Sequence, residues 1–544
     1  MDVYRFILRQ EIISNIGVYL NDKDISNLLL IFAHLVNCRS FWIERYYTFT
    51  STILKRLPGE TWGNSYFVRL SIFKGLFYSL YDVGYIPAIR YVISHKYHKV
   101  DTHHANIAAS HGDYKLLEYL QTLNPRVLPD VFGANMAAQN GNLEMLHYLD
   151  RLYICPNDHG INLAAQNGHL HVVEYLEWKL LGIPGIVGRA TYGLDETARN
   201  GHLNILEHMA SLYNPNRFDV FIANNAAEGG HINILEFLHS LSPPVHPNMH
   251  GADMAAQDGH LETIQYLFQR LNIFPSIKGA NSAAFNGHFK IVQYLCETIQ
   301  VFPDTLGANL AAEIGHIDIV KYLSEQSIYP DVHGANGAAY RGHVNVLEYL
   351  ATLSIYPNEV GVCSAIRSGK VSVIQYINRK RPQLFADLLS ETSPLLEKYE
   401  QFGLNAAAAD GHIDMLKFFG EMVRPLYPNS HGANRAVSNG HLNVVRYLST
   451  CYPPIYPDNI ESINTAAAKG YLDILQCIHK IHPELVPNVD GANLAAKYGR
   501  LHVIRWLLNL SPPVSPNLYG VKYAEKYGYS EDVVAIIHQY RITI

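Results

Sequence analysis

The chain has 544 residues, of which 48% are hydrophobic and only 17% are charged. It can therefore bury a large core, and it is not typical of a disordered chain or a coiled coil. Lys and Arg number 42 against 48 Asp and Glu, a net charge of −6, from which we expect no nucleic acid partner. No run of about 18 apolar residues occurs, so no membrane partner is expected either.

Residues 1–74 lack the repeat that fills the rest of the chain, and they predict a small helical domain. Asn21-Asp22 forms a turn between two helical patterns, and Asp24 is a candidate N-cap of the second helix. The apolar side chains at helical spacing on either side of this turn are Ile12, Ile16, Leu20, Ile25 and Leu28.

This segment resembles an F-box. The residues that match the family's pattern are Leu8, Glu11, Ile12, Tyr19, Leu20, Lys23, Asp24, Ile25, Leu28 and Trp42. Arg9 stands where the family has a proline. The resemblance implies that the apolar set Ile12, Ile16, Leu20, Ile25 and Leu28 binds a Skp-type adaptor of a cullin ubiquitin ligase. The alternative is a helical cap that only closes the apolar end of the repeat array.

From residue 75 to the C-terminus a block such as Gly133-Ala134-Asn135-Met136-Ala137-Ala138-Gln139-Asn140-Gly141 recurs. We call the residue six before the closing glycine the anchor. A degenerate first copy has its anchor at Tyr78. The other anchors are Asn106, Asn135, Asn162, Asp195, Asn224, Asp253, Asn281, Asn309, Asn336, Cys363, Asn405, Asn434, Asn464, Asn493 and Lys522. Sixteen units, mostly 27–30 residues long, predict a solenoid in which stacked units bury one another's apolar faces.

Each unit predicts two helices and a turn. The first helix is short and rich in alanine, as in residues 134–139, and Gly141 ends it as a left-handed cap would. The second helix carries apolar residues at helical spacing, as in residues 170–178. A Pro-Asx pair such as Pro129-Asp130 then forms a turn before the next unit. The fold class is therefore all-α.

The units resemble the ankyrin repeat. The Ala-Ala-x-x-Gly-His core of that family is matched at residues 164–169, whereas Gly-Ala-Asn replaces the family's Thr-Pro-Leu-His opening. The period is also shorter than the family's 33 residues. This short variety resembles the ankyrin arrays that are abundant in giant viruses of amoebae and in some protists. The resemblance implies a host–virus setting and a place in the cytoplasm of the host cell or in its nucleus.

One long interval, 42 residues between the anchors Cys363 and Asn405, contains an insertion within residues 378–400. It predicts a longer loop or an extra helix, or alternatively an element that docks a partner. The expected domains are 1–74, repeats over 75–377, the insertion at 378–400, and repeats over 401–544.

No catalytic, cofactor or metal site is expected. The six cysteines lie far apart with no Cys-x-x-Cys pair, which is typical of free thiols in a reducing compartment. The repeated Gly-His histidines fall about 10 Å apart in stacked helices, too far to share one metal ion, so we expect them to bond backbone at the turn between the helices. His103-His104 is an isolated pair without a third ligand. No hydrolase, nucleotide-binding or kinase motif occurs, so the chain is not expected to be an enzyme.

A solenoid offers a long surface for a protein partner. We expect the fourth and fifth residues after each anchor to be exposed. In consecutive units these positions hold aromatic and arginine residues, the types enriched where binding energy concentrates. The candidate protein-binding residues are Phe285, Ile314, Tyr340, Arg341 and Arg367. Local packing between units is the alternative explanation.

The sequence thus predicts a monomeric, protein-binding repeat scaffold. If residues 1–74 form an F-box, the chain would present its unknown protein target to a ubiquitin ligase. If they form only a cap, it is a scaffold without that link.

Overall fold

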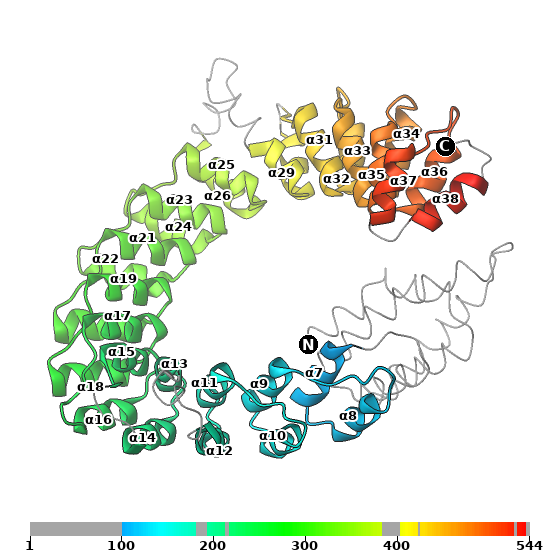
Figure 1. Ribbon diagram of the computed structural model, residues 1–544. Coiled ribbons are helices and arrows are strands. Elements are labelled where there is room, and N and C mark those ends of the chain that lie inside the picture. The colour runs from blue at the N-terminus through cyan, green and yellow to red at the C-terminus, as the bar shows by residue number, and fades with distance from the viewer. Residues whose placement is uncertain are drawn as a thin grey trace, which may run out of the picture. The chain divides into compact units, whose positions relative to one another are not determined.

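The structure, a computed structural model, describes residues 101–180, 193–212, 217–382, 403–422, 425–526 and 530–539. All regular elements in these ranges are helices, paired in a repeated arrangement (Figure 1). The chain is an all-α helical-repeat solenoid, as predicted. It divides into two compact units, residues 1–251 and 252–544. The degenerate copy at Tyr78 and the whole of residues 1–74 lie outside the described residues.

In the described part of residues 1–251, five helix pairs follow one another along the chain. They are α7 (Thr102–Ser110) with α8 (Tyr114–Gln121), α9 (Val131–Gln139) with α10 (Leu143–Asp150), α11 (Asp158–Gln166) with α12 (Leu170–Leu180), α13 (Leu194–Arg199) with α14 (Leu203–Leu212), and α15 (Val220–Glu228) with α16 (Ile232–Ser240).

The unit of residues 252–544 continues the pattern, beginning within α17 (Met249–Asp258), which pairs with α18 (Leu261–Leu271). The next pairs are α19 (Ile277–Phe285) with α20 (Phe289–Tyr294) and the π-helical turn η2 (Leu295–Ile299), α21 (Thr305–Ile314) with α22 (Ile317–Glu325), α23 (Val332–Arg341) with α24 (Val344–Thr352), and α25 (Glu359–Arg367) with α26 (Val371–Lys380). After the insertion come α29 (Asn405–Ala409) with α30 (Ile413–Gly420), α31 (Ser430–Asn439) with α32 (Leu442–Thr450), α33 (Ile460–Lys469) with α34 (Leu472–Ile481), α35 (Val489–Lys497) with α36 (Leu501–Leu508), and α37 (Leu518–Lys526) with α38 (Ser530–Gln539).

Most first helices begin about three residues earlier than the sequence predicts, although α13 and α29 do not. In α9, for example, the helix starts at Val131 because Asp130 is its N-cap: the Asp130 side chain accepts a hydrogen bond from the Phe132 N–H at 2.9 Å. The Pro-Asx pair is therefore more than a turn. It ends the linker and starts the following helix with the same two residues.

Packing within a unit follows the predicted periodicity. Most first helices have a fully buried alanine pair, such as Ala311 and Ala312 in α21, which lets neighbouring first helices approach closely. The second helices bury an apolar stripe, in α22 Ile319, Val320 and Leu323. In most successive pairs, such as α21 and α23, the first helices pack against one another much more extensively than the second helices do. No described helix is both long enough and apolar enough to cross a membrane.

Most anchor asparagines join their unit to the next. Asn281 Oδ1 accepts a hydrogen bond from the Asp304 N–H at 3.0 Å, and Asn281 Nδ2 donates to Asp304 Oδ1 at 2.9 Å. The same Asp304 side chain caps α21 through the Leu306 N–H at 2.9 Å. Equivalent bonds from the anchor oxygen to the backbone N–H of the following cap are made by Asn106, Asn135, Asn224, Asn309, Asn336, Asn405, Asn434, Asn464 and Asn493.

The glycine of the Gly-Ala-Asn motif is required by this contact. A Cβ added at Gly334 would lie 2.6 Å from Asn309 Oδ1 and 3.0 Å from its Cα. Real Cβ atoms do not come so close to other heavy atoms, so only glycine leaves room for the asparagine of the preceding unit. The motif is thus a matched set in which the asparagine of one unit occupies the space beside the glycine of the next.

One exception supports this account of the motif. Where the anchor is Asp253, a carboxylate that cannot donate, the following cap is Ser276, whose hydroxyl donates to Asp253 Oδ2 at 2.8 Å. The Ser276 N–H also donates to Asp253 Oδ1 at 2.6 Å. The hydrogen bond between the two side chains is kept, but here the cap residue is the donor and the anchor residue is the acceptor.

We predict that Asn281→Ala loosens the junction between α19 and α21. The Asp304 amide and carboxylate lose their partner at a part-buried site, a change that costs about 1–3 kcal/mol. Hydrogen–deuterium exchange should speed up in the first turn of α21, and the denaturation midpoint should fall. Asn345→Ala, at an exposed position of α24, is the matched control and should leave both unchanged. Equal effects of the two substitutions would contradict the role assigned to the anchor.

Candidate protein-binding face

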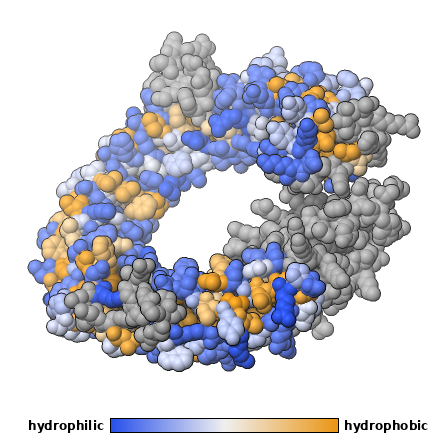
Figure 2. Space-filling model, in the orientation of Figure 1, coloured by the Kyte–Doolittle hydropathy of each residue, from blue (hydrophilic) through white to orange (hydrophobic). Residues whose placement is uncertain are grey.

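The first helices share one exposed face. Positions three before, one after and four after the anchor are spaced i, i+4 and i+7, so they lie on the same side of the helix. In α21 these are Leu306, Leu310 and Glu313, whereas the residues between them, Gly307, Ala308, Ala311 and Ala312, are buried. Over the surface of the described parts, apolar residues are scattered among hydrophilic ones (Figure 2).

Four adjacent first helices, α19, α21, α23 and α25, bring together large exposed side chains on this face. We call it the α19–α25 face and define it by Lys278, Ser282, Phe285, Leu306, Leu310, Glu313, His333, Gly337, Tyr340, Val360, Ser364 and Arg367. Three of the predicted binding residues belong to it and are exposed: Phe285 (36%), Tyr340 (47%) and Arg367.

The other two predicted residues stand at the fifth position after the anchor, at the end of their helices. Ile314 is half-buried, directly before the left-handed Gly315. Arg341 is exposed, and its Nε lies 3.1 Å from Glu313 Oε1 on the neighbouring helix α21. This pair is about half exposed, so it contributes on the order of 0–1 kcal/mol to stability.

Sequence reasoning missed the two most exposed aliphatic residues of the face, Leu306 (57%) and Val360 (56%). Both lie in the first turn, three residues before the anchor. The signal was present, because extending the helical period backward from the exposed fourth position leads to them. It was overlooked because the first helix was expected to start only after these residues.

The middle row of the face carries mostly small side chains, so it is lower than the two edges. It holds Ser282, Gly337 and Ser364, with half-buried Leu310 as the one large side chain. A Cβ added at Gly337 would lie 2.7 Å from Glu313 Cβ, so α23 can approach α21 this closely only with glycine there. The face therefore has a first-turn edge with Leu306 and Val360 and a last-turn edge with Phe285, Tyr340 and Arg367. The two edges are seven residues, or about 10 Å, apart along each helix.

The Gly-His histidines are structural. Nε2 of His231, His288 and His316 lies 2.8–3.0 Å from a backbone carbonyl at the end of the preceding first helix, namely that of Arg199, Gln257 or Phe285. A carbonyl only accepts, so Nε2 carries the proton. The prediction of a bond to backbone is confirmed for these three, but the acceptor belongs to the preceding unit. Their rings also cover the preceding left-handed glycine: a Cβ at Gly259 would lie 2.7 Å from His288 Cε1.

Burial acts on some of these imidazoles. It lowers the pKa of His169 below the ordinary 6.5, and the neighbouring His171 ring lowers it further, against the opposite effect of a hydrogen bond to the Gln139 carbonyl. Burial likewise lowers the pKa of His202, which bonds the Gln166 carbonyl. The neutral imidazole is thus the form that the folded chain favours at these two positions.

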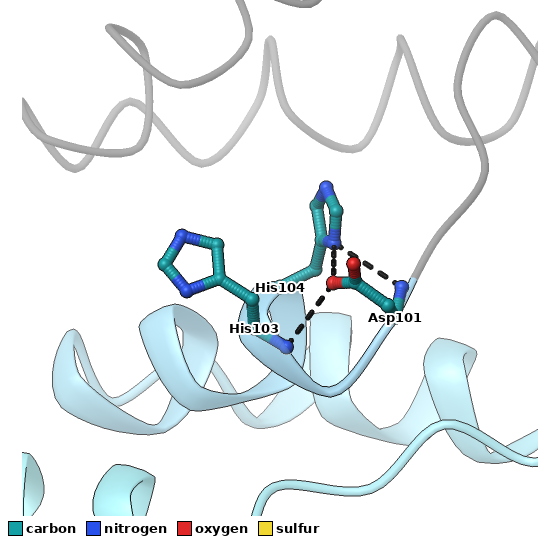
Figure 3. A network of polar contacts seen from close by, with 3 residues as sticks. All are labelled: Asp101, His103 and His104. Carbon is teal, nitrogen blue, oxygen red and sulfur yellow. Dashed lines mark hydrogen bonds and ion pairs between the residues drawn. The ribbon is translucent and has the colours of Figure 1, made fainter. Parts of the chain in front are cut away.

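His103 and His104 do not converge on a common point (Figure 3). His104 is fully buried and its Nδ1 lies 2.6 Å from Asp101 Oδ1, while the Asp101 carboxylate also accepts from the His103 N–H at 3.1 Å. Burial raises the pKa of Asp101, but the hydrogen bond and charge of His104 outweigh it and lower the pKa overall. The three residues form the N-terminal cap of α7.

The described residues contain no group of three or more His, Cys, Asp or Glu side chains placed to hold a metal ion. Cys155, Cys296, Cys363, Cys451 and Cys477 are free thiols. Burial raises the pKa of Cys296 to about 11, and the nearby Glu297 adds to this shift, so its thiol stays protonated and unreactive at neutral pH. The predicted adaptor-binding residues Ile12, Ile16, Leu20, Ile25 and Leu28 lie outside the described residues.

Among known proteins the likeness to this chain is remote. No protein-family model matches the chain, and no curated protein matches it. Among solved structures, the pentatricopeptide repeat protein PPR10 in complex with an 18-nt psaJ RNA element is 13% identical, with a TM-score of 0.32, over 92% of this chain and 88% of that one. Another structure, of PPR10 from maize, is 12% identical, with a TM-score of 0.26, over 96% of this chain and 99% of that one.

The prediction that nucleic acid is excluded as a partner is wrong as an exclusion. One of these pentatricopeptide repeat proteins was crystallised in complex with RNA. A net charge summed over 544 residues averages acidic and basic surfaces and excludes nothing about any one of them. The likeness itself assigns no ligand to this chain.

We predict that the array loses stability in mild acid through His169 and His202. Their folded-state pKa values lie below 6.5, so the unfolded chain binds protons first as the pH falls. The stability they contribute is complete above about pH 6.5 and declines as the pH falls toward the folded-state values. Thermal unfolding between pH 7.5 and 5.5 should therefore show a shallower decline for His169→Gln/His202→Gln than for the unchanged chain.

The matched control is His159→Gln/His250→Gln, which alters two exposed histidines. It should reproduce the decline of the unchanged chain. Superimposable curves for all three proteins would show that the histidines facing the preceding glycines do not carry the pH dependence.

Proposed function

We propose that the chain is a non-catalytic, protein-binding repeat scaffold of the ankyrin type, and that the α19–α25 face holds a segment of its target. The observation that carries this proposal is the exposure of Leu306, Tyr340 and Val360 on three adjacent first helices. Covering each of these half-exposed side chains would contribute on the order of 1 kcal/mol to binding.

The internal architecture supports the ankyrin type. Buried alanine pairs, a left-handed glycine such as Gly315, and a histidine that bonds the preceding unit occur at the positions of the Ala-Ala-x-x-Gly-His core. These contacts occupy the buried positions of the first helix and leave its exposed face free to vary between units. Variation in Leu306, Tyr340 and Arg367 therefore changes what the solenoid binds without changing how it stacks.

Site-specific photocrosslinking in eukaryotic cell lysate tests the proposal. Benzoylphenylalanine placed at position 306 or 340 of the full chain should give discrete protein adducts, because both positions lie on the proposed face. The same group at position 348, exposed on the second helix α24, is the control and should give none. Excess unlabelled chain should suppress the adducts, whereas excess Leu306→Ser/Tyr340→Ser chain should not.

Two results would contradict the proposal. One is equal labelling from positions 306, 340 and 348. The other is adducts that disappear on ribonuclease treatment, which would point to RNA as the ligand of this face.

A second candidate function concerns residues 1–74. The F-box pattern through Leu8, Glu11 and Ile12 supports an adaptor-binding module that would present the captured target for ubiquitination in the host cell. Under this hypothesis Ile16 and Leu20 face the adaptor. Under the alternative, residues 1–74 cap the solenoid.

We predict that the full chain recovers a Skp-type adaptor and a cullin from eukaryotic lysate and that Ile16→Asp/Leu20→Asp does not, because charged side chains on the adaptor-facing side prevent docking. Circular dichroism should be the same for both proteins. If neither protein recovers the adaptor, the ligase link is removed. If deletion of residues 1–74 makes the remaining array aggregate, the cap is favoured.

A further inference from the structure

The charges on the α19–α25 face are segregated. Cationic side chains gather at its last-turn edge, where Arg341 and Arg367 end α23 and α25 and Lys370 follows in the turn to α26. The carboxylate of Glu313 also lies at this edge and pairs with Arg341. Neither Arg367 nor Lys370 forms an ion pair with another residue in the part of the chain that the structure describes. Two positive charges therefore remain at the α25 end of this edge, next to α23 with Tyr340, whereas Phe285 lies on α19 at the other end.

The first-turn edge is different. Two residues before this edge, the cap carboxylates Asp304 and Asp331 accept hydrogen bonds from first-turn amides at 2.9 and 2.7 Å. Glu359 adds a third carboxylate at the start of α25. Lys278 is the one cation in this row on the four helices. The first-turn edge is therefore aliphatic, with carboxylates at the helix starts beside it, whereas the last-turn edge is aromatic and, at its α23–α25 end, positively charged.

An extended peptide matches such a divided face, because its successive side chains point to opposite sides. A strand that crosses the helices over the low middle row of Ser282, Gly337 and Ser364 would direct alternate side chains to the two edges. One set would meet Leu306 and Val360, and the other would meet Arg367 and Tyr340. The first edge selects aliphatic side chains, and the second selects carboxylates.

The length of the segment is set by helix spacing. Four adjacent first helices are separated by three intervals of about 8–10 Å, so the face is roughly 24–30 Å long. An extended chain advances about 3.3 Å per residue. About eight residues therefore span the face.

We propose that the α19–α25 face binds an extended protein segment of about eight residues in which aliphatic side chains alternate with Asp or Glu. This inference rests on the proposed function, since it names the chemistry of the segment held there. A single-stranded nucleic acid suits the face less well. Its backbone carries a phosphate at every nucleotide, whereas the first-turn edge would place Asp304, Asp331 and Glu359 against it.

Fluorescence anisotropy with the full chain tests the inference. The probes are four labelled nine-mers: Leu and Glu alternating, the same composition with all Leu before all Glu, Leu and Lys alternating, and oligouridylate. The alternating Leu/Glu probe should bind at least tenfold more tightly than each of the others. Its affinity should fall as salt rises from 50 to 500 mM, because charge pairing contributes to it.

Variants locate the binding. Arg367→Glu should weaken the alternating Leu/Glu probe at least tenfold, and Arg367→Gln should weaken it less. Leu306→Ser should weaken all Leu-containing probes, since it removes an apolar contact. Arg446→Glu, on the exposed side of the second helix α32, is the matched charge-reversal control and should have no effect. Circular dichroism verifies that each variant keeps its helical content.

The outcomes separate this inference from the function on which it rests. If the Leu/Lys probe binds as well as the Leu/Glu probe, or if Arg367→Glu has no effect, the acidic segment is refuted. Photocrosslinks at positions 306 and 340 would then still support a protein-binding face. If no probe binds and those positions also give no protein adducts, both proposals fail. Oligouridylate binding that Arg367→Glu abolishes would assign the face to RNA instead.

Discussion

In most units of this solenoid the carboxamide of one asparagine holds the unit to the next. In the Asn281–Asp304 junction the amide both accepts from the backbone and donates to the side chain of the following helix cap. The same cap side chain satisfies first-turn N–H groups that have no partner within the helix. One linked set of bonds thus starts a helix, ends a linker and fixes the spacing between units. In one unit Asp253 replaces the anchor asparagine and Ser276 replaces the Asx cap, and the two side chains still form a hydrogen bond. The junction therefore requires a complementary donor and acceptor.

A second set of bonds closes the other end of the first helices. Unpaired carbonyls of the last turn accept hydrogen bonds from side chains of the next unit; the Gln257 carbonyl accepts from both Asn286 and His288. The residue after the left-handed glycine differs between units, and a residue other than histidine can still donate a hydrogen bond to the preceding unit. Arg500 stands there in a later unit, and its Nε donates to the Ala468 carbonyl at 3.1 Å. Hydrogen bonds to the neighbouring unit at both ends of the first helix explain how units of 27–30 residues stack with short linkers.

The helix ends and the alanine face form the contacts between stacked units. The exposed positions of the first helix are therefore the ones that differ from unit to unit. On α19, α21, α23 and α25 they divide into an aliphatic edge and an aromatic, basic edge. Gly337 contributes both to stacking and to the exposed face. It leaves room for Glu313 of the neighbouring helix, and it adds no side chain to the middle row of the face. The proposed binding chemistry therefore depends on side chains that stacking leaves free.

Local sequence pattern determined much of the secondary structure and of the repeat organisation of this protein. The period, the two helices per unit, the buried alanine pairs and the glycine stop all follow from short-range rules of helix propensity, capping and apolar spacing, and residues such as Ala311 and Gly315 confirm them. Phe285, Tyr340 and Arg367 were also identified as exposed, because one helical face repeats in every unit. The partners of Asn281 and His316, in contrast, lie 23 and 31 residues away. Only stacking brings such groups together. It also decided that Arg341 pairs with Glu313. A side chain's neighbours along a helix depend on sequence alone, but its neighbours in the next unit depend on how closely two backbones approach.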